Sequence, residues 1–71
     1  MQEIKASMAG NVWKIVVEQG EAVEAGQDVV ILESMKMEIP ISSEAKGKIK
    51  EIKVEEGSFV NDGDVLMTLE D

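Results

Sequence analysis

Apolar residues in this chain occur in short runs with alternating polarity rather than at helical spacing. β-Branched residues are dense in these runs, as in Ile15-Val16-Val17 and Val29-Val30-Ile31, and such residues favour strands. No stretch keeps a helical period over the roughly 11 residues that would indicate an amphipathic helix. The pattern predicts eight short strands, near residues 2–7, 11–17, 22–24, 29–34, 37–42, 47–54, 59–61 and 65–70.

The two halves of the chain repeat each other. Gly10–Glu33 aligns without a gap on Gly47–Glu70, and nine of the 24 aligned positions are identical. Two copies are too few for a solenoid, which needs at least about three. The repeat therefore predicts one domain, residues 1–71, with two halves related by a pseudo-two-fold axis. Its expected fold is all-β, an eight-stranded flattened barrel or sandwich, also called a barrel-sandwich hybrid.

The parity of the apolar positions changes within two of these strands. Ile15 and Val17 share one face, whereas Val12 has the opposite parity, which predicts a β-bulge or a bend at residues 13–14. The second half has the same change and predicts a bulge or a bend at residues 50–51. Trp13 should lie near the surface, because the repeat places Lys50 at the equivalent position. The glycines at 20, 26, 57 and 63 lie at turns between strands, and we expect each to supply either a positive φ angle or a close backbone approach.

The composition excludes several classes of function. The chain has no cysteine and no histidine, so it forms no disulfide, and it lacks the residues of thiolate catalysis, histidine triads and the usual zinc sites. Its net charge of −8 at pH 7 opposes binding to nucleic acid and to anionic membranes. Asn61-Asp62-Gly63-Asp64 lacks the remaining spacing of a calcium loop and is expected to be a turn. We therefore expect no metal site and no catalytic residues.

The termini and apolar runs give expectations about location. No apolar run approaches the roughly 20 residues that a membrane span needs. The start, Met-Gln-Glu-Ile-Lys, has neither the basic nor the apolar region of a signal peptide. No linker rich in proline or alanine precedes the first strand. We expect a free-standing, monomeric, cytoplasmic protein.

The joint between the two halves carries the candidate chemistry. Leu32 closes the first repeat, and Ile39 and Ile41 alternate after it, so the chain must reverse near residues 35–37 in a tight hairpin. Lys36 would lie exposed at its tip. A lysine at a hairpin tip is ordinarily a solvated charge. Met35 and Met37 allow two interpretations, a surface gripped by another protein or side chains folded back onto the core edge.

The segment Glu-Ser-Met-Lys-Met-Glu at residues 33–38 resembles the biotin attachment signature of biotinyl domains. The flanking repeats also resemble the biotinyl/lipoyl attachment family, including Gly-x-x-Val-x-x-Gly before the attachment strand. The resemblance covers about residues 4–70, and it is strongest to small free-standing biotin/lipoyl attachment proteins and to domains of biotin carboxyl carrier proteins. The thumb insertion found in some of those carriers is missing here.

The resemblance implies a role for each residue of the hairpin. Lys36 would carry biotin in amide linkage, and Met35 and Met37 would be recognised by biotin protein ligase. Glu33 matches a position that lipoyl-attaching enzymes favour. Lipoyl domains usually have Asp-Lys at the tip, whereas this chain has Met-Lys, which makes lipoate the second candidate cofactor.

The family's activity gives the functional expectation. The chain would be a non-catalytic carrier that moves carboxyl groups between a biotin carboxylase and a carboxyltransferase. The alternatives are a lipoyl carrier for acyl or aminomethyl transfer and an unmodified interaction module. The tether of lysine and cofactor would raise the local cofactor concentration at a docked active site, and the chemistry would belong to the cofactor.

Overall fold

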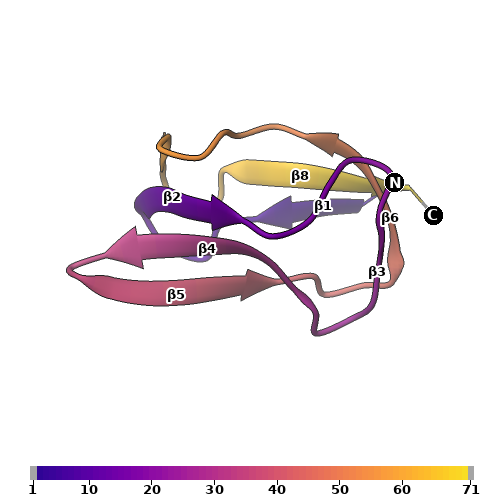
Figure 1. Cartoon of the computed structure of the whole chain (residues 1–71), viewed down its shortest axis with the longest axis horizontal. Helices are drawn as coiled ribbons and strands as arrows, with labels where there is room; N and C mark the ends of the chain where they lie inside the picture. Colours follow the sequence, from indigo (N-terminus) through magenta and orange to yellow (C-terminus); the bar gives the residue numbers. More distant parts are fainter. Residues whose placement is uncertain (1, 71) are drawn as a thin grey trace.

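The computed structural model describes residues 2–70, and every regular element within this range is a strand (Figure 1). The all-β prediction is confirmed, with strand ends that differ by up to two residues. The eight strands are β1 (Gln2–Lys5), β2 (Gly10–Ile15), β3 (Ala22–Val23), β4 (Asp28–Ser34), β5 (Met37–Ser42), β6 (Gly47–Ile52), β7 (Phe59–Val60) and β8 (Val65–Glu70).

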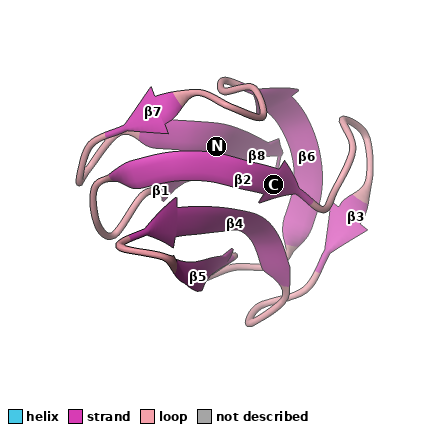
Figure 2. Ribbon diagram, turned by 60° about the vertical axis from the view of Figure 1, so that its left-hand side comes forward, coloured by secondary structure: helices cyan, strands magenta, loops and turns pink. Residues whose placement is uncertain are grey.

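The strands form two antiparallel sheets that face each other and make a flattened barrel (Figure 2). One sheet has the order β1-β8-β6-β3 and the other the order β5-β4-β2-β7. Each sheet takes strands from both halves of the sequence, since β3 pairs with β6 and β7 pairs with β2. Neither half can therefore complete a sheet without the other.

Matching backbone hydrogen bonds show the pseudo-two-fold relation directly. The Gly20 N–H donates to the Ile49 carbonyl, and in the other half the Gly57 N–H donates to the Val12 carbonyl, both at 2.7 Å. Both bonds join a turn of one half to a strand of the other. The repeat seen in the sequence is thus a repeat of structure, and its two copies hold each other together.

Both predicted irregularities are present, and both are shifts in strand register of the kind that a β-bulge makes. The register of β2 against β4 shifts between Val12 and Lys14, and the register of β6 against β8 shifts between Ile49 and Glu51. The extra residue in β2 is Trp13, which is 47% exposed, as the comparison with Lys50 predicted. The bulges allow inward-facing apolar residues on both sides of the parity change, so the core continues along the full length of each strand.

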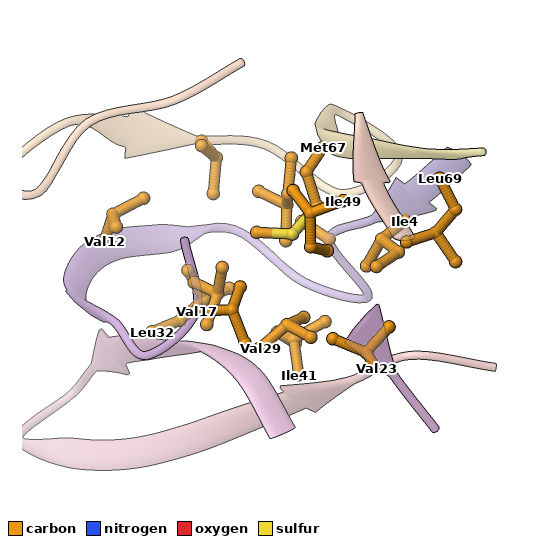
Figure 3. Packing of buried hydrophobic residues seen from close by; sticks show 14 residues of the cluster. Ile4, Val12, Val17, Val23, Val29, Leu32, Ile41, Ile49, Met67 and Leu69 are labelled. Atoms are coloured by element: carbon orange, nitrogen blue, oxygen red, sulfur yellow. The ribbon is translucent and has the colours of Figure 1, made fainter. Parts of the chain in front are cut away.

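Fourteen buried apolar residues fill the space between the sheets (Figure 3). They come from all eight strands and from the segments beside them, so burying this one cluster fixes both sheets together. The cluster consists of Ile4, Ala6, Val12, Val17, Val23, Val29, Val30, Leu32, Ile41, Ile49, Val60, Leu66, Met67 and Leu69.

Several strands are shorter than predicted because the chain leaves the ladder to change sheets. Ala6, expected in the first strand, instead donates its N–H to the Asp64 carbonyl at 2.9 Å. Val17 lies beyond the end of β2 yet stays buried, as the chain crosses towards β3. Sheet-crossing segments remain apolar, so hydrophobic pattern alone assigns them to the strands.

The four turn glycines fulfil the first of the two expectations, since their φ angles lie from +87° to +93° and an added Cβ atom would meet nothing within 4 Å. At Gly63, with φ +89°, the N–H donates to the Ala6 carbonyl at 2.8 Å, which ties the turn before β8 to the end of β1. This conformation disfavours any residue with a Cβ atom.

The molecule is elongated, with principal extents of 34 × 19 × 18 Å. The β4–β5 hairpin lies at one end of the long axis, and the ends of the chain lie at the other (Figure 1). Near those ends Gln2 of β1 pairs with Leu69 of β8. In the pseudo-two-fold arrangement this pairing is equivalent to that of Ile39 with Leu32 in the β4–β5 hairpin.

Candidate functional site: the β4–β5 hairpin

The hairpin closes with a two-residue turn. Ser34 pairs with Met37, and the residues between them, Met35 and Lys36, have φ angles of +52° and +64°. Positive φ at both central residues identifies a type I′ turn, whose twist matches that of the flanking strands. These two residues are the only non-glycine residues with positive φ within the described part of the chain. Residues 34–37 are called the tip below.

The tip presents the Lys36 side chain to solvent. Lys36 is exposed, and within residues 2–70 its Nζ has no hydrogen bond or ion pair. The two-residue turn leaves no room for the lysine to fold into the barrel. Its amine is therefore accessible to a second protein from several directions, as a covalent attachment point requires.

Both tip methionines are exposed, Met35 by 90% and Met37 by 63%. Met37 has the same parity as Ile39 and Ile41, whose side chains turn inward, but it lies beyond the end of the core. Met67, by contrast, is fully buried. The structure therefore contradicts the interpretation in which both tip methionines pack against the core edge. Two large thioethers lie in solvent on either side of Lys36.

Glu33 lies on the outer face of the sheet, directly opposite Glu38 on β5. Both carboxylates are exposed, and Cβ atoms of such opposed residues are about 5 Å apart. Like charges in this arrangement repel each other, and no ion pair offsets the repulsion within the described residues. The base of the tip is therefore an acidic surface that faces away from the core.

A close backbone contact, which the sequence did not assign to the site, supports this base. A Cβ atom added at Gly10 would lie 3.0 Å from the Glu33 carbonyl oxygen, and one added at Gly47 would lie 2.8 Å from that of Glu70. Neither glycine has a positive φ, so the requirement is space rather than conformation. The sequence offered one signal for this contact, since the repeat aligns Gly10 with Gly47 and so places a glycine at the same position in both halves. Gly10 lets β2 approach β4 closely just below the tip.

Other candidate chemistry is lacking in the part of the chain that the structure describes. No group of three or more histidine, cysteine, aspartate or glutamate side chains lies together as a metal site within residues 2–70. In the Asn61–Asp64 segment the Asp64 carboxylate accepts the Asn61 N–H at 2.8 Å, which closes a turn. None of the described segments forms a helix long and apolar enough to cross a membrane.

A rigid small barrel with one exposed lysine on a protruding turn is the architecture of a domain for covalent cofactor attachment. Comparison with known proteins agrees, since the family model described as "Biotin-requiring enzyme" matches residues 2–69. The chain belongs to this biotin/lipoyl family, and as a member it is a cofactor carrier rather than an enzyme.

Individual relatives define the similarity further. The chain is 56% identical over 66 residues to the biotin/lipoyl attachment protein of Bacillus subtilis (strain 168), covering 93% of this chain and 90% of that protein. The structure superposes on urea carboxylase of Kluyveromyces lactis with a TM-score of 0.91 and 32% identity, over 97% of this chain and 6% of that one.

A lipoyl domain is also similar. The lipoyl domain of the 2-oxoglutarate dehydrogenase complex from Azotobacter vinelandii gives a TM-score of 0.80 at 31% identity. The match covers 100% of this chain and 98% of that domain. The comparisons thus establish the attachment domain and leave the choice between biotin and lipoate to the chemistry of the tip.

Proposed function

We propose that Lys36 carries biotin in amide linkage and that the domain moves carboxyl groups between a biotin carboxylase and a carboxyltransferase. The observation that supports this most strongly is the exposure of Met-Lys-Met on the type I′ turn. Two apolar side chains in solvent beside a charged one are unfavourable without a partner that covers them. A ligase that recognises the tip would provide this partner during attachment.

The residues of the tip fit the attachment reaction. The Lys36 ammonium must lose a proton before its Nζ attacks the activated carboxyl group that the ligase holds. The turn keeps this Nζ clear of the barrel and of other protein groups. Since the φ angles of Met35 and Lys36 are fixed by the closing pair of Ser34 and Met37, the lysine side chain leaves the turn in a defined direction, away from the barrel.

The barrel contributes rigidity and reach after attachment. Bound biotin supplies the chemistry of accepting and releasing a carboxyl group. The core cluster and the bonds between the two halves keep the hairpin from collapsing, so the flexible part is the lysine arm with its cofactor. A short flexible arm on a rigid body raises the local concentration of cofactor at whichever active site the domain docks against.

Lipoate is the second candidate, favoured by the position of Glu33. Its exposed carboxylate lies at the base of the tip, where the family resemblance assigns recognition by lipoyl-attaching enzymes. In that case the domain would serve acyl or aminomethyl transfer. Met35 argues for biotin, because it occupies the place where lipoyl domains usually have aspartate. An unmodified interaction module is the third candidate, and it would leave Lys36 free.

Intact mass spectrometry of the full chain purified from its native cell separates the three candidates. We expect a biotinyl increment that maps to Lys36, whereas a lipoyl increment would support the second candidate and an unmodified mass the third. Incubation of the purified chain with a biotin protein ligase and, separately, with a lipoyl ligase should give attachment with the former.

Two lysine variants make this test specific. Lys36→Arg should abolish attachment while keeping the fold and charge, because a guanidinium is not deprotonated in proteins. Lys46→Arg is the matched control, since Lys46 is also exposed but lies outside the tip, beyond the end of β5, and this variant should be modified as fast as the parent. Attachment to Lys36→Arg at the parent rate would overturn the assignment.

A further inference from the structure

The methionines of this chain differ sharply in exposure. Among those described, Met67 is fully buried, Met8 is half-buried, Met37 is 63% exposed and Met35 is 90% exposed. Oxidation of a thioether requires contact between its sulfur and the oxidant, so exposure determines which methionine reacts. The chain has no cysteine, whose thiolate would compete for the same oxidants. Within residues 2–70, the tip methionines are therefore the most accessible thioethers.

We propose that Met35 and Met37 form a reversible oxidation site, and that sulfoxide formation at this site blocks cofactor attachment to Lys36. The proposal rests on the proposed function, because it assigns a regulatory chemistry to the same tip that the biotin ligase recognises. The modification changes the two side chains that bracket the reactive amine, and it leaves the core untouched.

Hydrogen peroxide is the oxidant. A lone pair of the methionine sulfur attacks one peroxide oxygen, the O–O bond breaks and an S–O bond forms. The sulfur loses two electrons, the proton of the attacked oxygen passes to the second peroxide oxygen, and that oxygen leaves as water. Methionine sulfoxide reductases reverse the change. In that direction two thiols are oxidised to a disulfide, the S–O bond breaks and the oxygen leaves as water.

The sulfoxide alters recognition without altering the fold. A thioether packs into an apolar pocket, whereas a sulfoxide brings a strong hydrogen-bond acceptor that such a pocket leaves unpaired. We expect at least a tenfold fall in kcat/KM for ligation. Because Met35 and Met37 lie outside the core cluster, the melting temperature should change little. Met67 belongs to the core cluster and is shielded from the oxidant, so the fold should survive oxidant doses that modify the tip.

The test treats the unmodified full chain with dilute hydrogen peroxide and maps added oxygen by peptide mass spectrometry. Ligation by a biotin protein ligase is then measured before treatment, after treatment and after incubation with methionine sulfoxide reductases and a thiol. We expect oxygen on Met35 and Met37 well before Met67, a loss of ligation that follows this modification, and recovery after reduction. The folded state is checked by melting temperature at each stage.

Two variants assign the effect to the tip. Met8→Leu should lose ligation on peroxide treatment as the parent does, because Met8 lies outside the tip. The double variant Met35→Leu, Met37→Leu should keep its own starting rate, whatever that rate is, through the same treatment. Loss of rate in this double variant would show that peroxide acts elsewhere and would overturn the proposal.

The remaining outcomes separate the inference from the proposed function. Oxidation of Met67 as fast as Met35 would overturn the proposed site. Full sulfoxide formation at the tip with an unchanged ligation rate would overturn the proposed block while leaving biotin attachment intact. Failure of the untreated chain to accept biotin from the ligase would overturn the proposed function itself, and it is seen before any oxidant is added.

Discussion

The turn at the tip stores backbone strain that a single substitution can remove. Met35 has a φ of +52°, a left-handed conformation that is unfavourable for most residues other than glycine, asparagine and aspartate. The left-handed region costs an ordinary L-residue on the order of 1–2 kcal/mol. Asparagine is a preferred first residue of type I′ turns, so Met35→Asn should recover much of this cost.

The magnitude follows from the exposure of the side chain. Because Met35 is 90% exposed, its replacement removes almost no buried apolar surface. The change in stability therefore comes from the backbone strain at this position. We expect Met35→Asn to raise the free energy of unfolding by about 0.5–1 kcal/mol. For a domain of this size the melting temperature should rise by several degrees, at about 4–8 °C per kcal/mol.

Thermal and urea denaturation measure this gain, and Met37→Asn is the matched control. Met37 lies in β5 and has no positive φ, so asparagine, which is depleted in strands, should leave stability unchanged or lower it. Equal stability of Met35→Asn and the parent, or an equal gain in both variants, would refute the assignment of strain to the turn. A more stable Met35→Asn that is biotinylated more slowly would show that recognition is obtained at the expense of stability.

Three further predictions concern the turns, the strand contacts and the choice of cofactor. Gly63→Val should lower the free energy of unfolding by about 1–3 kcal/mol, since a β-branched residue is strained at a φ of +89°; an unchanged urea midpoint would contradict this. Gly47→Ala should destabilise more than Gly10→Ala, because its Cβ would lie 2.8 Å rather than 3.0 Å from a carbonyl oxygen; paired melting curves check the order. Met35→Asp should be biotinylated more slowly and lipoylated faster, since an unpaired carboxylate is costly in an apolar ligase pocket. Paired assays with both ligases measure the two rates, and biotinylation of Met35→Asp at the parent rate would count against recognition of the methionines by biotin ligase.

The sequence predicted the features that depend on local pattern. The parity change between Val12 and Ile15 located a bulge without any knowledge of the partner strand, because the side-chain period of a strand is two. The positive φ at the four turn glycines followed from residue type. The hairpin around Lys36 followed from apolar residues on both sides of a short polar break. In each case a few neighbouring residues carry the whole signal.

The features that the sequence did not predict depend on contacts between distant segments. The repeat does not show that β3 and β7 exchange between the halves, because it relates equivalent residues of the two copies and carries no information on which copy each strand pairs with. The contact of Gly10 with the Glu33 carbonyl needs the register of β2 against β4. The type I′ turn was missed for another reason, since Met-Lys is a poor sequence for it and residue preference argues against the observed φ angles.

Because the chain ends lie opposite the tip, rotation of the domain about its chain ends would move the tip farther than any other part of the barrel. A flexible segment joined at Gln2 or Glu70 would act as the pivot, and the tip would travel on an arc whose radius approaches the 34 Å length of the molecule. Pivoting through a moderate angle then carries Lys36 over a distance comparable to the whole domain, with no change inside the barrel. Since Gln2 pairs with Leu69, a connection at either end has the same pivot point. The same geometry would let one barrel serve as a separate protein or as the swinging part of a much longer chain.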